Sequence, residues 1–213
     1  MLATRNDKDL RETVDRGIPP AKDPNDPPRD PVGDHQDLMI LAGQELRAHG
    51  HEAAADSFFA RTAQELATLP ANATKVQMRR QAHAFYEAKD YARAKAAFAA
   101  IVQRDSLDIE SEGRFGTAAA HLGDLTTVSK VDSHLASMKR PFLMGRTLRW
   151  RADIAAVQGR AGDACLLLEQ AVRQGHRLMD TPLNLTVHLD GDFGAVRSHP
   201  AYAALLQSLA ETR

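Results

Sequence analysis

Two short stretches of the chain place side chains in patterns that can bind metal ions. His49 and His51 flank a glycine in HGHE, and His188, Asp190 and Asp192 alternate in HLDGDF. A zinc site needs three or four ligands, and the two histidines have no third ligand beside them in sequence. The second stretch lacks the further oxygen ligands and the closing glutamate of a calcium loop. We therefore predict a structured turn at each place, with no metal and no cofactor.

Catalysis would require a different grouping of side chains. His83 lies one helical turn after Arg79, but a histidine acts as an acid or base only beside a partner in a pocket. Cys165 falls in the apolar run ACLLLEQA and should be buried, so it is a poor nucleophile. The stretch GRAGDA has the wrong glycine spacing for a phosphate-binding loop. The sequence therefore predicts a protein that is not an enzyme.

Composition limits the class of protein further. The chain has 213 residues, of which 43% are hydrophobic and only 5% aromatic, and alanine is abundant. This composition favours closely packed helices over a sheet sandwich. The formal net charge of −1 provides no overall field to attract nucleic acid or an anionic membrane.

The location of the protein is predicted from its cysteine content and its apolar runs. A single cysteine cannot form an internal disulfide, which favours a reducing compartment. No run approaches the roughly 18 apolar residues of a membrane span, and the N-terminus lacks the apolar core of a secretory signal. We expect a cytoplasmic protein without a membrane span.

The first 36 residues differ from the rest of the chain. They hold six of the ten prolines, all within IPPAKDPNDPPRDPVGDH, together with many charged side chains. We predict that residues 1–36 form an extended or disordered arm, in which residues 7–17 could become helical against a partner. Residues 37–213 are predicted to form one helical domain.

The stretch KDYARAKAAFAAIVQRDS shows how these helices pack. Tyr91, Ala94, Phe98 and Ile101 are three or four residues apart, so they share one face of a helix. The same pattern recurs in other helices, with offsets of 39, 34 and 36 residues between its central small residues. Those residues are Ala55, Ala94, Val128 and Ala164, and each follows by twelve positions a small residue of the preceding helix, namely Gly43, Ala82, Gly116 and Ala152.

These units resemble the tetratricopeptide repeat, a helix-turn-helix of about 34 residues with small residues at fixed points. The best match is QMRRQAHAFYEAKDYARAKAAFAAIV, and the weakest unit has Asp132 where the pattern expects an aromatic residue. The resemblance implies an all-α fold, an α-solenoid of about four hairpins. Their expected ranges are 37–66, 74–105, 108–138 and 143–175.

Residues 176–213 are expected to close this helical stack. A final helix from His199 to Leu209 would cover the last hairpin with Tyr202, Leu205, Leu206 and Leu209. Phe193 and Val196 would fix the connection that leads into this helix.

The resemblance also implies a concave groove lined by the first helix of each hairpin. Five of the eleven side chains placed there are arginines, whose guanidinium groups bind carboxylates bidentately, so an acidic peptide is the expected ligand. The groove residues are Gln44, Arg47, Arg79, His83, Tyr86, Arg114, Thr117, Arg146, Arg149, Trp150 and Asp153.

Two functions follow as hypotheses. In the first, the protein is an interaction module or scaffold subunit of a larger complex that binds another protein or peptide through its groove or its N-terminal arm. In the second, it is a regulatory or sensor domain whose helical array binds a small ligand or a signalling peptide. An open trough would favour the first and a closed pocket the second. Nucleic acid is not an expected partner.

Overall fold

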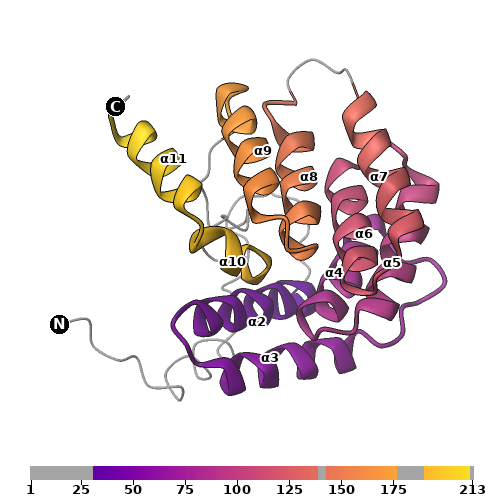
Figure 1. The fold of residues 1–213 in the computed structure, drawn as a ribbon. Helices are drawn as coiled ribbons and strands as arrows, with labels where there is room; N and C mark the ends of the chain where they lie inside the picture. The colour runs from indigo at the N-terminus through magenta and orange to yellow at the C-terminus, as the bar shows by residue number, and fades with distance from the viewer. Residues whose placement is uncertain (1–30, 139–142, 177–189, 212–213) are drawn as a thin grey trace, which may run out of the picture. The chain divides into compact units, whose positions relative to one another are not determined.

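The computed structural model describes residues 31–138, 143–176 and 190–211, and over these residues it is all-helical, without a strand (Figure 1). The predicted all-α fold of consecutive helical hairpins is therefore confirmed. The helices are α2 (Pro31–Ala48), α3 (Glu52–Glu65), α4 (Lys75–Glu87), α5 (Tyr91–Arg104), α6 (Ile109–His121), α7 (Leu125–Ser137), α8 (Arg146–Val157), α9 (Ala161–Arg173), a 3-10 turn η1 (Gly191–Phe193), α10 (Gly194–Arg197) and α11 (Pro200–Glu211).

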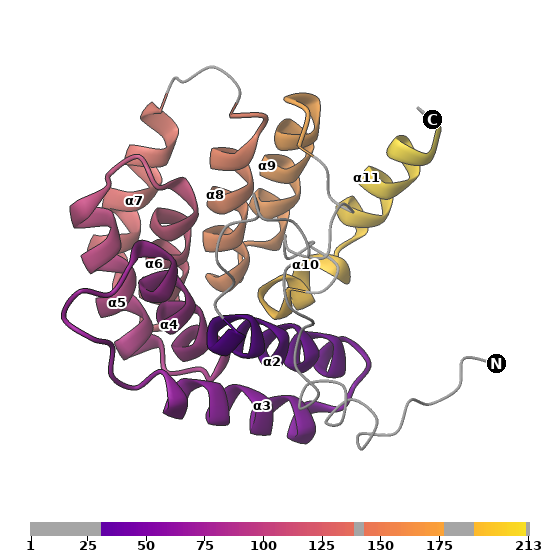
Figure 2. The ribbon, with the colours of Figure 1, turned by 180° about the vertical axis from the view of Figure 1, so that it is seen from behind.

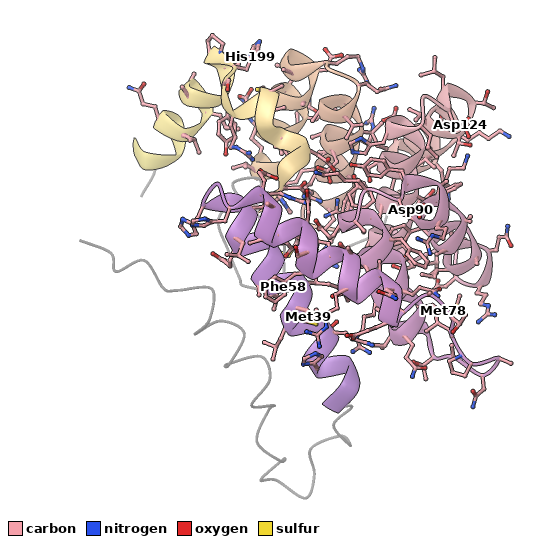
Figure 3. All side chains as sticks on the ribbon, turned by 90° about the horizontal axis from the view of Figure 1, so that it is seen from below. Met39, Phe58, Met78, Asp90, Asp124 and His199 are labelled. Carbon is pink, nitrogen blue, oxygen red and sulfur yellow. The ribbon has the colours of Figure 1, made fainter. Side chains whose placement is uncertain are left out.

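The chain divides into two compact units, the first ending at Asp90 and the second beginning at Tyr91. In the first unit α2 and α3 form a hairpin, and α4 packs against both helices. Met39 and Phe58, labelled in Figure 3, belong to the buried core of this hairpin. A Cβ atom added to Gly43 would lie only 2.6 Å from the Phe59 ring, so the glycine lets α2 approach this ring closely.

Helix α2 begins earlier than the sequence indicated. We expected a non-helical arm up to residue 36, whereas residues 31–36 form the first turns of α2. Pro31 is compatible with this start because the first residues of a helix need no hydrogen-bonded N–H group. Residues 1–30, including the predicted short helix at 7–17, lie outside the described residues.

In the second unit α5 packs against α6, α6 and α7 form one hairpin, and α8 and α9 form another. Helix α6 also packs against α8, so the two hairpins stack. Figures 1 and 2 show α8 and α9 side by side from opposite directions. The closing elements η1, α10 and α11 then pack on α8 and α9.

The structure supports the repeat register predicted from the sequence. Every small residue that we placed at the centre of a second helix is buried, and so are the small residues of the first helices. Gly116 lies against Val131 and Ile154, and a Cβ atom added at this position would lie only 2.8 Å from the Val131 side chain. Asp132, the exception to the pattern, is partly exposed and accepts a 2.8 Å hydrogen bond from Arg151 of α8. The apolar contact has thus moved to the neighbouring Val131, while Asp132 links the third hairpin to the fourth.

The turns inside the four predicted hairpins have the same geometry. Each contains one residue with a positive φ, and the next N–H donates to the carbonyl five residues earlier, which is the Schellman pattern of helix ends. These bonds measure 2.9 Å in all four turns and run from His51 to Leu46, Asp90 to Phe85, Asp124 to Ala119 and Arg160 to Ala155. The positive-φ residues are Gly50, Lys89, Gly123 and Gly159.

Lys89 is the non-glycine residue among these four, with a φ of 61°. We expect Lys89→Gly to raise the free energy of unfolding by about 0.5–1 kcal/mol. A left-handed backbone costs a non-glycine residue roughly 1–2 kcal/mol, and glycine avoids this cost. Part of the gain is offset because glycine loses more backbone entropy on folding. Urea unfolding followed by circular dichroism measures the change. Lys89→Ala is the matched control, since it removes the exposed 3.4 Å ion pair with Asp56 but keeps the Cβ atom. An equal gain in both variants would contradict backbone strain as the cause.

The closing segment packs largely as expected. Phe193, Val196, Tyr202 and Leu205 are buried in one cluster with residues of α8 and α9. Leu206, which we expected to join them, is instead 38% exposed. The expectation failed because the helix turns adjacent leucines to different faces, and here Leu205 takes the buried position. The side chain of Leu209 lies outside the described ones.

Candidate functional site

The second unit contains a buried group of charged side chains, here called the arginine cluster, which consists of Arg114, Arg149, Asp153, Asp190 and Asp192. Arg114 comes from α6, and Arg149 and Asp153 lie one turn apart on α8. Arg114 is 1% exposed and Asp153 is fully buried. Charged side chains are seldom buried this deeply unless they are paired, so the geometry of their partners defines the site.

Two of the three acids come from the turn that precedes α10. Asp190 Oδ2 lies 3.0 Å from Arg149 Nη2 and 3.4 Å from Arg114 Nη2, so one carboxylate joins α6 to α8. Asp192 Oδ2 lies 3.7 Å from Arg114 Nη1. The Arg197 guanidinium donates a 2.8 Å hydrogen bond to the Asp190 carbonyl and thereby holds the turn from its other side. The turn is thus bound by its side chains and by its backbone.

Asp190 also shapes the turn that carries it. Its Oδ1 atom accepts a 3.1 Å hydrogen bond from the Asp192 N–H at the start of η1. This geometry confirms the predicted structured turn in HLDGDF over its described part. An aspartate at this position satisfies a backbone donor with one oxygen while its other oxygen remains available to the arginines.

Trp150 forms the apolar floor of the arginine cluster. The guanidinium carbons of Arg149 and Arg114 lie 4.1 Å and 5.0 Å from the centre of its ring, close enough for cation–π attraction. The ring presses against α6 at Gly113, where an added Cβ atom would lie 2.2 Å from Trp150 Cδ2. Only glycine permits this approach, so Gly113 sets the distance between the α6 backbone and the ring.

His121 continues the site towards α5. Its Nε2 atom lies 2.9 Å from Asp192 Oδ1, and its ring stacks on Tyr91 with 3.8 Å between the ring centres. Asp192 therefore lies between a histidine and an arginine.

Asp153 is the acid that α8 itself supplies. Its Oδ2 atom forms an ion pair with Arg149 Nη1 at 2.7 Å, but neither carboxylate oxygen accepts a hydrogen bond from the described residues. Burial raises the pKa of Asp153 well above its usual range, although Arg149 opposes this shift. Asp153 therefore remains protonated to a higher pH than an exposed aspartate does.

His176, which follows α9, is affected in the opposite direction. Burial, together with the positive charges of Arg149 and Arg146, lowers its pKa to about 4. The pKa of a histidine in an unfolded chain is about 6.5, so as the pH falls the unfolded chain takes up a proton at His176 before the folded chain does. The stabilising effect of neutral His176 is therefore present above pH 6.5 and is lost as the pH falls towards 4.

We expect His176→Gln to reduce the loss of stability between pH 7 and pH 4 by up to about 2 kcal/mol, allowing for partial solvent screening. Urea unfolding at several pH values in this range measures the difference from the unaltered protein. His51→Gln, which changes an exposed histidine of the first unit, is the matched control. Parallel profiles for His176→Gln and the unaltered protein would contradict the prediction.

The eleven predicted groove residues fall into two groups, one in each unit. In the second unit Arg114, Arg149, Trp150 and Asp153 meet in the arginine cluster. The buried Thr117 hydroxyl donates a 3.1 Å hydrogen bond to the Arg114 carbonyl. Arg146 is exposed.

In the first unit the predicted groove residues surround an acid of α4. Gln44 Nε2 donates a 2.8 Å hydrogen bond to Glu87 Oε1, and Arg47 Nη1 donates a 2.9 Å bond to Glu87 Oε2. Glu87 is buried, so Gln44 and Arg47 of α2 hold an internal carboxylate. Of the remaining residues on α4, Tyr86 is buried, and Arg79 and His83 are partly buried.

Sequence reasoning missed the acids that pair with these basic residues. Asp190 and Asp192 were noticed as potential metal ligands, and Glu87 was not singled out. A useful signal was present: the two aspartates and the following aromatic residue in DGDF form an acidic segment of the kind that we expected an arginine-rich groove to bind.

Two further reactive side chains, Cys165 and His199, lie close together in the second unit. Cys165 is buried, and burial raises its thiol pKa, which disfavours the reactive thiolate. His199, labelled in Figure 3, has its Nδ1 atom 3.9 Å from Cys165 Sγ, but that nitrogen also accepts a hydrogen bond from the Ala201 N–H. His49 and His51 are exposed, and the part of the chain that the structure describes holds no group of three metal-ligating side chains.

Comparison of the chain with protein-family models, curated proteins and solved structures finds no match. None of the described helices is both long and apolar enough to cross a membrane.

Proposed function

We propose that this protein is a non-enzymatic interaction module of the tetratricopeptide-repeat type, which binds an acidic segment of a partner protein in the cytoplasm. The observation that carries the proposal is the arginine cluster, in which side chains of α6 and α8 bind two aspartates of a short segment. The site has the chemistry of an acidic-peptide receptor, with two permanent positive charges and an aromatic floor.

The repeat geometry supports the same function. The four hairpin turns share one hydrogen-bond pattern, and the small residues recur at matching positions of the helices. Within the second unit the α6–α7 and α8–α9 hairpins stack, and stacked hairpins of this kind present their first helices on a common face, which is suited to binding a peptide. The buried Cys165 thiol is compatible with a reducing cytoplasm.

Selection of a displayed random-peptide library on the intact protein tests this function. We expect enrichment of peptides that contain two acidic residues and an aromatic residue, and we expect their binding to weaken with salt. Each enriched peptide is then measured by fluorescence anisotropy against Arg149→Gln, with Arg173→Gln as the control for loss of an exposed arginine. Enrichment of neutral or basic peptides, or equal binding by both variants, would contradict recognition of acids by the arginine cluster.

A further inference from the structure

We infer that residues 190–193 occupy the partner site in cis, and that a partner segment of the pattern Asp-x-Asp-aromatic binds by taking their place. This inference rests on the proposed function, because it names the chemistry of the partner and the element that competes with it. Residues 190–193 are called the acidic turn below.

The contacts of the acidic turn specify what the partner must supply. Its first acid bridges two arginines, with Asp190 Oδ2 at 3.0 Å from Arg149 and 3.4 Å from Arg114. Its second acid lies between Arg114 at 3.7 Å and His121 at 2.9 Å. The aromatic residue follows at once, since Phe193 is fully buried with its ring 5.7 Å from the Arg149 guanidinium. Gly191 between the acids is exposed, so the spacer residue is not restricted by burial.

The charges of the cluster favour an incoming acidic segment. Two of the three aspartates of the arginine cluster belong to the acidic turn, so its departure removes two negative charges from beside Arg114 and Arg149. A buried site with an excess of positive charge is costly without an anion. An incoming segment with the same two acids restores the balance, whereas a neutral segment does not.

Three apolar anchors follow the acidic turn, namely Val196, Tyr202 and Leu205, and they are buried with Phe193 in the cluster formed with α8 and α9. We expect these three anchors to hold the closing segment on the helices when the acidic turn is displaced. A partner with an aromatic residue replaces the Phe193 contact as well as the charges. The cis segment nevertheless has the advantage of a high effective concentration, on the order of millimolar for a tethered segment. We therefore expect the unaltered protein to bind an isolated peptide weakly.

The experiment uses the chain's own segment as the probe. A fluorescein-labelled peptide with the sequence of residues 188–197 is titrated into the intact protein and into the double variant Asp190→Asn, Asp192→Asn, and anisotropy is recorded. Asparagine keeps a side-chain acceptor at the turn while removing the charge. The matched control protein carries Asp163→Asn and Glu169→Gln, which remove one exposed and one partly buried acid of α9. The control peptide has the same sequence as the probe, except that asparagine replaces Asp190 and Asp192.

We expect the double variant to bind the acidic peptide at least about tenfold more tightly than the intact protein or the control protein, because its own turn competes less well. The control peptide should not bind. Equal affinity for all three proteins would overturn the cis-occupancy inference while leaving acidic-peptide recognition intact. Absence of binding to every protein would overturn both.

Two further measurements address folding and the source of the occupant. Hydrogen exchange of the intact protein at saturating peptide should be faster in residues 190–197 than without the peptide. This result does not depend on the double variant being folded. Unchanged exchange in these residues would overturn the inference. Sedimentation velocity should show the intact protein as a monomer. A dimer that dissociates in the double variant would identify a second copy as the occupant and overturn the inference.

Discussion

Replacement of Arg149 by methionine is expected to lower the free energy of unfolding by about 3–5 kcal/mol, the usual cost of removing one partner from a buried ion-pair network. Arg149 pairs with Asp153 at 2.7 Å and with Asp190 at 3.0 Å, so its loss leaves two buried carboxylates without this counter-ion. Methionine keeps much of the side-chain volume, so the loss reports charge more than packing. Urea unfolding followed by circular dichroism measures the effect.

Arg146→Met is the matched control, because Arg146 is an exposed arginine of the same helix. It should change stability by no more than about 0.5 kcal/mol. Adding Asp153→Asn to Arg149→Met should restore part of the loss, since one of the two carboxylates is then neutral. The network interpretation fails if Arg149→Met costs no more than Arg146→Met.

Phe193→Ala is expected to destabilise the protein by a similar amount, about 3–5 kcal/mol. Phe193 is fully buried in the cluster that joins the closing segment to α8 and α9. Removing its ring reduces the buried apolar surface and leaves a cavity. It also removes the apolar contact that anchors the chain directly after Asp190 and Asp192. We expect the variant to show lower stability and faster hydrogen exchange in residues 190–205.

Leu166→Ala is the control for Phe193→Ala, because Leu166 lies on α9 but is 58% exposed. Its effect should be within about 0.5 kcal/mol. A loss below about 1 kcal/mol for Phe193→Ala would mean that the closing segment is not anchored by this ring.

The helices and their register could be predicted because their signals are local in sequence. Apolar spacing of three and four residues identifies the buried face of a helix, and a small residue on that face marks a close contact. Ala55, Ala94 and Ala164 were placed on buried faces in this way, and all three are fully buried. Asp132 could be recognised as an exception, but its partner Arg151 belongs to another hairpin and could not be predicted from spacing alone.

The arginine cluster was only partly predictable for the same reason. Arg114, Arg149, Trp150 and Asp153 lie on regularly spaced helix faces, so their grouping followed from the repeat. Asp190 lies 76 residues after Arg114 in the chain, and its position depends on where the closing segment returns to the helices. An exposed solvated face and a buried ion-pair network contain the same residue types, so periodicity cannot distinguish them.

Trp150 has a consequence for how this protein can be studied. It is the single tryptophan of the chain, and its indole ring is buried between the Gly113 backbone and two guanidinium groups. Indole emission moves to longer wavelength when water reaches the ring and changes in intensity when neighbouring charges move. The native protein therefore carries an intrinsic optical reporter at the floor of the arginine cluster, and its emission spectrum can follow the departure of the acidic turn without any label.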